Sequence, residues 1–191
     1  MIKNHLLITD SYVDYHKFSS WLSDCYDLEI ISIAEIVRLE LRSKSLIGSK
    51  MLSYIENGEL IPNNLLFELI EKKMSSQSED FLMLGFPRTL EQFSLLIDFF
   101  NSSNISVECA WYLKVINIDY LASLEHNRNK ATNQKFGITE KSIKDKMLSY
   151  SNTLSDIANQ LKKRLKVRVY EIDYEKGKPR EKDFVDFVKN V

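Results

Sequence analysis

The segment Gly85-Phe86-Pro87-Arg88-Thr89-Leu90-Glu91-Gln92 stands between an apolar run, Phe81 to Leu84, and a stretch of helical period. A segment that follows a strand and opens a helix lies at the carboxyl edge of an α/β sheet, where such sheets bind their ligands. Gly85 lets a ligand approach the backbone closely, and Arg88 offers a fork of donors that suits phosphate. Gln92, one helical turn later, can pair with an acceptor and a donor on the edge of adenine. The segment therefore predicts a site for a phosphate-bearing ligand.

The same segment has a second interpretation that needs no ligand. Thr89 and Gln92 have the spacing of a capping box, in which two side chains satisfy backbone N–H groups at the start of a helix. Taken alone, the segment does not decide between a ligand site and a capping box.

Outward from this segment, short apolar runs alternate with longer stretches of helical period, which is typical of a parallel α/β sheet. The connections are long enough for the crossovers that parallel strands require. We therefore expect five parallel strands with helices between them. The expected strands are His5 to Thr9, Leu28 to Ile31, Phe81 to Leu84, Cys109 to Val115 and Val167 to Ile172.

The connection between the second and third expected strands holds more helix than a simple crossover needs. We expect helices over Ala34 to Leu41, Ser45 to Asn57 and Asn63 to Met74, the last one opened by Pro62. This amount of helix between two strands predicts an inserted helical subdomain. Farther along, a polar loop near residues 129–137 precedes a long helix from about Thr139 to Lys163.

Composition excludes several classes of function. The 191 residues are 44% hydrophobic and 28% charged, as in ordinary soluble proteins, and the net charge of −1 gives no general attraction to nucleic acid or anionic membrane. The basic stretch from Lys162 to Arg168 reads as a solvated helix end. We expect no nucleic-acid partner.

Metal and membrane roles are likewise not expected. Cys25 and Cys109 are too few for a disulfide framework or a cysteine-based zinc site, and the three histidines lack ligand spacing. No stretch has the pattern of an export signal or the length of a membrane span, so we expect no membrane association and a cytoplasmic location.

Several segments together carry a family resemblance. The run GFPRTLEQ closely resembles the adenylate kinase signature G-F-P-R-T-x-x-Q, and Ile31 to Arg38 is similar to that family's I-S-T-G-D-x-x-R. Gly48 and the run Asn57-Gly58-Glu59-Leu60-Ile61-Pro62 resemble its L-G…G-x-L-V-P stretch. The resemblance runs in unbroken order from about residue 28 to 97 and more weakly beyond.

The resemblance implies an α/β fold of the P-loop NTPase type, with a doubly wound five-stranded parallel sheet, an inserted monophosphate-binding subdomain and a short lid. On this pattern the core is 1–31, 63–128 and 139–191, the subdomain is 32–62, and the lid is 129–138. A monomer is the family's usual state.

The resemblance also implies the roles of individual residues. Arg38 and Arg88 would hold the AMP phosphate, Gln92 would read the adenine, and Gly85 and the backbone of Ile61 would line the base pocket. Ile33 departs from the family's threonine and removes one hydrogen bond, worth about 0.5–1.5 kcal/mol.

The largest departure lies after the first strand, where the family has the phosphate loop G-x-P-G-x-G-K-G-T for ATP. Here the segment is Thr9 to Lys17, which contains no glycine, and the first glycine of the chain is Gly48. A phosphate nest needs residues that adopt positive φ with open backbone. This segment instead has bulky aromatics and two carboxylates, Asp10 and Asp14, which we expect to repel a triphosphate. We therefore expect no ATP-phosphate site and no metal site.

Other positions that support phosphoryl transfer in the family also differ. Leu84 replaces an aspartate, Leu124 replaces one of two arginines while Arg128 keeps the second, and Lys144 and Lys146 replace arginines. Leu84 and Leu124 are expected to fill a drier, packed interior. Only Glu35 keeps a carboxylate for magnesium.

Three functions follow as hypotheses. The first is a catalytically impaired pseudo-kinase that binds AMP or another nucleoside monophosphate. The second is an active kinase that uses Mg-ATP through a non-standard donor site, where His16, Lys17 and Arg128 would supply the positive charge. Its catalytic residues would be Arg88 and Arg128. The third is a non-catalytic interaction scaffold with an unidentified protein partner.

Overall fold

Five strands form one parallel sheet in the order β2-β3-β1-β4-β5. The structure is a computed structural model that describes residues 4–43, 45–57, 59, 61–131 and 139–190. The strands are β1 (Asn4–Thr9), β2 (Glu29–Ser32), β3 (Phe81–Leu84), β4 (Val107–Val115) and β5 (Lys166–Ile172). Each expected strand is present within about two residues of its predicted bounds, and the predicted fold class is confirmed.

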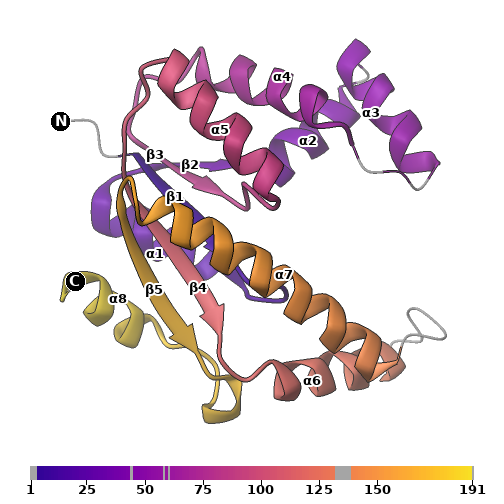
Figure 1. Ribbon diagram of the computed structural model, residues 1–191, viewed down its shortest axis with the longest axis vertical. Helices are drawn as coiled ribbons and strands as arrows, with labels where there is room; N and C mark the ends of the chain where they lie inside the picture. Colours follow the sequence, from indigo (N-terminus) through magenta and orange to yellow (C-terminus); the bar gives the residue numbers. More distant parts are fainter. Residues whose placement is uncertain (1–3, 44, 58, 60, 132–138, 191) are drawn as a thin grey trace.

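Helices cover both faces of the sheet (Figure 1). One face packs against α4 (Asn63–Met74), α5 (Leu90–Ser102) and much of α7 (Glu140–Leu161). The other packs against α1 (Tyr15–Tyr26), α8 (Glu181–Lys189), the start of α7 and part of α6 (Ile118–Ala131). Strands β1, β3 and β4 are largely buried and contain apolar runs in the sequence, whereas the edge strand β5 is mostly half-exposed and alternates apolar with polar residues. A short 3-10 turn, η1 (Tyr174–Lys176), follows β5.

The helices between β2 and β3 have a small apolar cluster of their own. In α2 (Ile33–Arg42) and α3 (Leu46–Glu56), the serine before each helix accepts a hydrogen bond from a backbone N–H in its first turn. Buried Met51 of α3 packs with Leu65 and Leu69 of α4, while other residues of α4 face the sheet. The three predicted helices are therefore confirmed. The α4 helix joins the helical part to the sheet.

Gly48 sits where α2 and α3 touch. A Cβ atom at this position would lie 2.3 Å from the carbonyl oxygen of Glu40, which is backbone and cannot rotate away. We expect Gly48→Ala to lower the free energy of unfolding by about 1–3 kcal/mol through overpacking, despite the better helix propensity of alanine. Urea denaturation measures this change. Lys50→Ala, at an exposed position on the same helix, is the control, and an equal effect of the two substitutions would contradict the close contact.

Helices α6 and α7 are tied together near the predicted lid. Lys144 forms an ion pair with Asp119, and Ser123 forms a hydrogen bond with Glu140. The α6 helix continues to Ala131, so it includes the first residues of the predicted lid, 129–138. The rest of that segment, 132–138, lies outside the described residues.

Aromatic residues at helical spacing anchor the first helix to the sheet. Phe18 is buried, and Tyr15 and Trp21 are half-buried against the same apolar cluster. Tyr12, however, precedes the helix, is 52% exposed and has a left-handed backbone (φ 64°). The segment between β1 and α1 is therefore a turn, and α1 begins only at Tyr15.

Candidate functional site

A cavity of about 400 Å³ lies at the carboxyl edge of the sheet, beside the end of the central strand β1. Residues from the turn after β1, the start of α1, the segment after β3, and α7 line it. They are Thr9, Asp10, Ser11, Tyr12, Val13, Tyr15, Arg88 and Tyr150. The cavity occupies the place where open α/β sheets bind ligands. It brings the Arg88 segment together with the segment that replaces the ATP-phosphate loop.

Arg88 is held by the backbone of Gly85. The Arg88 Nε atom donates to the carbonyl oxygen of Gly85 at 3.0 Å, and Gly85 has a left-handed φ of 69° that side chains rarely adopt. None of the ion pairs among the described residues involves Arg88. Its terminal nitrogens are thus free to bind an anion, which agrees with the phosphate role predicted for this residue.

Gln92 forms the capping arrangement that the sequence offered as an alternative. Its backbone N–H donates to Thr89 Oγ1 at 3.1 Å, and its side-chain Oε1 accepts from the N–H of Arg88 at 2.9 Å. Its Nε2 donates to Asn63 Oδ1 at 3.1 Å. Both ends of the amide are therefore used within the chain. The adenine role of Gln92 stays a prediction.

Of the five predicted AMP residues, only Arg88 is among the described residues that line this cavity. Arg38 is exposed on α2, and Ile61 is half-buried against the apolar cluster of the helical part. Neither lines the cavity at β1. Gly85 and Gln92 contact Arg88 without lining the cavity, while Arg38 and Ile61 lie on the helical part between β2 and β3.

Asp10 is the main correction to the expected electrostatics. Its side chain is only 4% exposed, and its oxygens accept hydrogen bonds from Tyr112 Oη (2.9 Å), Val115 N (2.8 Å) and Ser151 Oγ (3.1 Å). Burial raises the pKa of the Asp10 carboxyl, although these three donors act in the opposite direction. Asp10 thus joins β1, β4 and α7 through a buried network and does not present a free carboxylate to a phosphate. Asp14 is exposed, and its carboxylate lies 3.9 Å from Lys17 Nζ.

Tyr150 is a site residue that sequence reasoning missed. It is half-buried on α7 and lines the cavity together with Arg88. Burial is the largest influence on the pKa of Tyr150 and raises it, while the nearby positive charge of Arg88 lowers it. No local pattern marks this residue, because it meets Arg88 only through the packing of α7 across the sheet.

Of the two leucines expected in a packed interior, one is buried and the other is exposed. Leu84 is buried, as expected for a filled interior, but Leu124 is 43% exposed, so its predicted burial is wrong. Leu124 therefore lies on the surface of α6 instead of in the core. Arg128 is exposed, with Nη1 3.6 Å from Glu125 Oε1 on the same helix.

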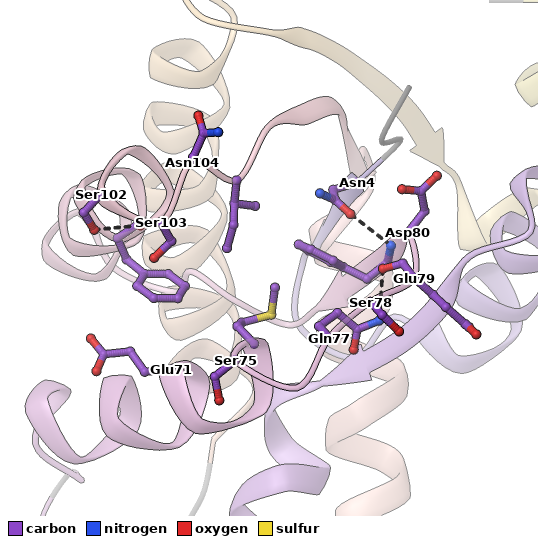
Figure 2. Close-up of a pocket in the computed structure, with 14 residues that line it drawn as sticks. Asn4, Glu71, Ser75, Gln77, Ser78, Glu79, Asp80, Ser102, Ser103 and Asn104 are labelled. Carbon is purple, nitrogen blue, oxygen red and sulfur yellow. Dashed lines mark hydrogen bonds between the residues drawn. The ribbon is translucent and has the colours of Figure 1, made fainter.

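Figure 2 shows a second cavity, of about 610 Å³, at the opposite, amino edge of the sheet. Asn4 closes one side of it, where its Oδ1 accepts a hydrogen bond from the N–H of Phe81. Three carboxylates line this cavity, from Glu71, Glu79 and Asp80, and its lining contains no lysine or arginine. This charge makes the second cavity unsuitable for a phosphate. The cavity at β1, which Arg88 of the GFPRTLEQ segment lines, is the candidate nucleotide site.

For the described part of the chain, the structure also bears on metal binding and on membrane spanning. There, no group of three or more His, Cys, Asp and Glu side chains is arranged so that it could hold a metal ion. Within the same residues, none of the helices has the length and apolar character needed to cross a bilayer.

Comparison with known proteins identifies the family. The family model described as adenylate kinase matches residues 18–174, beginning directly after the Thr9 to Lys17 segment. The chain is 33% identical over 85 residues to the adenylate kinase of Thermococcus sibiricus (44% of this chain, 38% of that protein). It is 34% identical over 89 residues to that of Pyrococcus horikoshii (47% and 40%) and 34% over 103 residues to that of Methanocella arvoryzae (53% and 45%). Each match spans less than half of the relative's length. Because the family model covers most of the chain, this protein belongs to the adenylate kinase family.

Proposed function

We propose that this protein binds a nucleoside monophosphate, AMP in the first instance, and transfers phosphate from ATP poorly or not at all. The observation that carries the proposal is the contrast between two segments at the same cavity. Arg88 is held in place by Gly85 with free terminal nitrogens, whereas the turn from Thr9 to Lys17 has no glycine.

The acceptor side is supported by residues that match the family's AMP signature. Arg88 and Arg38 would bind the phosphate, Gln92 would meet the adenine, and Gly85 and Ile61 would border the base. In this proposal, the helical part at 32–62 closes over the monophosphate, and the remaining core supplies Arg88. A monomer satisfies these roles, since every named residue comes from one chain.

The donor side lacks the groups that hold a triphosphate. A phosphate loop offers consecutive backbone N–H groups and a lysine. In the turn after β1, Tyr12 has positive φ but carries an aromatic side chain, and Lys17 Nζ lies 3.9 Å from Asp14. Loss of one preorganised electrostatic group costs on the order of 10²–10³ in rate. The family match also begins only at residue 18, after this segment.

A second candidate function is an active kinase that holds Mg-ATP by another route. Arg128 favours it, because this arginine remains at a family position on α6 and is exposed. In that case Arg88 and Arg128 would together stabilise the transferred phosphoryl group.

Calorimetric titration with AMP, and separately with ATP and magnesium, tests the proposal. We expect saturable heat from AMP and none from Mg-ATP. Binding of both, followed by ADP formation from ATP and AMP, would establish the active kinase instead. If neither nucleotide gave binding heat, the third hypothesis, a scaffold for a protein partner, would be favoured.

A further inference from the structure

The cavity at β1 has almost no net charge. Among its eight lining residues, Arg88 is the only cation and Asp10 the only carboxylate. The Asp10 oxygens are bound to Tyr112, Val115 and Ser151, so the carboxylate stays fixed beside the cavity. Arg88 can make one forked contact with a single phosphate group, but the buried acid beside it leaves no surplus positive charge. The additional negative charges of a polyphosphate would meet no further cation among the described lining residues.

Besides Arg88, the Tyr150 hydroxyl is available as a donor to an anion. None of the hydrogen bonds among the described residues uses the hydroxyl of Tyr150. Because burial raises its pKa, this hydroxyl keeps its proton at neutral pH and can donate it in a hydrogen bond. A tyrosine hydroxyl beside an arginine is a suitable pair for a phosphate oxygen.

The buried network around Asp10 fixes the position of Tyr150. Ser151, the next residue on α7, donates to Asp10 Oδ2 at 3.1 Å, and its carbonyl oxygen accepts from Tyr112 Oη at 3.3 Å. This turn of α7 is thereby attached to the ends of β1 and β4. Tyr150 consequently lines the cavity from a rigid element, as a preorganised binding residue should.

We propose that the phosphate of the bound nucleotide lies in this cavity between Arg88 and the hydroxyl of Tyr150, and that the cavity accepts a phosphate monoester but not a polyphosphate. This inference rests on the proposed function. It adds a binding residue from α7 and a reason for selectivity against ADP and ATP.

The test is Tyr150→Phe, which removes the hydroxyl and keeps the ring. We expect the affinity for AMP to fall about 10-fold, as for loss of one hydrogen bond to a charged group. The phosphorus NMR signal of bound AMP should also move, because the lost donor contacts the phosphate itself. Tyr170→Phe, the same exchange on β5, is the matched control and should change neither quantity.

Competition by metal-free ADP and ATP tests the selectivity. We expect each to bind the wild-type protein at least 10-fold more weakly than AMP, and ATP binding as tight as AMP would overturn the restriction to monoesters.

Unchanged AMP affinity and phosphorus signal in Tyr150→Phe would overturn the role of Tyr150, while the proposed function would stand. If the wild-type protein binds no AMP, the proposed function fails and this inference fails with it. Thermal melting of each variant separates a binding defect from a folding defect.

Discussion

Replacing Arg88 with alanine is expected to weaken AMP binding about 100-fold while the protein stays folded. Arg88 is the only cation among the described residues that line the cavity at β1, so its removal leaves no positive charge there to hold a phosphate. A charge-assisted, forked contact of this kind contributes about 1.5–3 kcal/mol, and the upper value corresponds to about 100-fold in affinity. The fold should tolerate the change, because the side chain is exposed and its Nε makes one bond, to Gly85. Calorimetric titration with AMP measures the loss.

Two further variants make this result specific. Arg88→Lys keeps the charge but not the fork, so its affinity should lie between those of the wild type and Arg88→Ala. Arg164→Ala removes an exposed arginine after α7, at the opposite edge of the sheet, and should bind AMP normally. Equal affinities of Arg88→Ala and Arg164→Ala would refute the phosphate role of Arg88.

Asp10→Ala is expected to lower the free energy of unfolding by about 2–5 kcal/mol. The change removes the acceptor for three buried or partly buried donors: the N–H of Val115 and the hydroxyls of Tyr112 and Ser151. Each donor left without a partner costs about 1–3 kcal/mol, and relief of the buried carboxylate offsets part of the sum. Urea denaturation monitored by circular dichroism measures the difference.

The same turn provides the control. Asp14→Ala removes an exposed carboxylate four residues later and should change stability by less than about 0.5 kcal/mol. Asp10→Asn keeps an acceptor oxygen and should retain part of the stability. A loss in Asp10→Ala no greater than that in Asp14→Ala would show that the network does not support the fold.

Much of the fold followed from local pattern. Strands β1 to β4 contain apolar runs bounded by polar segments, and β5 alternates apolar with polar residues. The helices after β2 begin with serines or a proline that the sequence shows directly. These signals are readable because burial on both sheet faces and helix capping act over a few residues. The Thr89 and Gln92 pair was readable as a capping box for the same reason. The absence of glycine from Thr9 to Lys17 is likewise a property of the sequence itself.

The orientation of side chains toward distant elements was decided only by tertiary structure. Asp10 was expected to face a phosphate, yet it turns inward to Tyr112 and Ser151, which are more than 100 residues away in the chain. Leu124 was expected inside and lies on the surface, while Tyr150 meets Arg88 only because α7 crosses the sheet. The sequence by itself determined the elements, their order and the signature that holds Arg88. Which groups surround that arginine depended on how β1, β4 and α7 pack, because such contacts join residues that no local pattern relates.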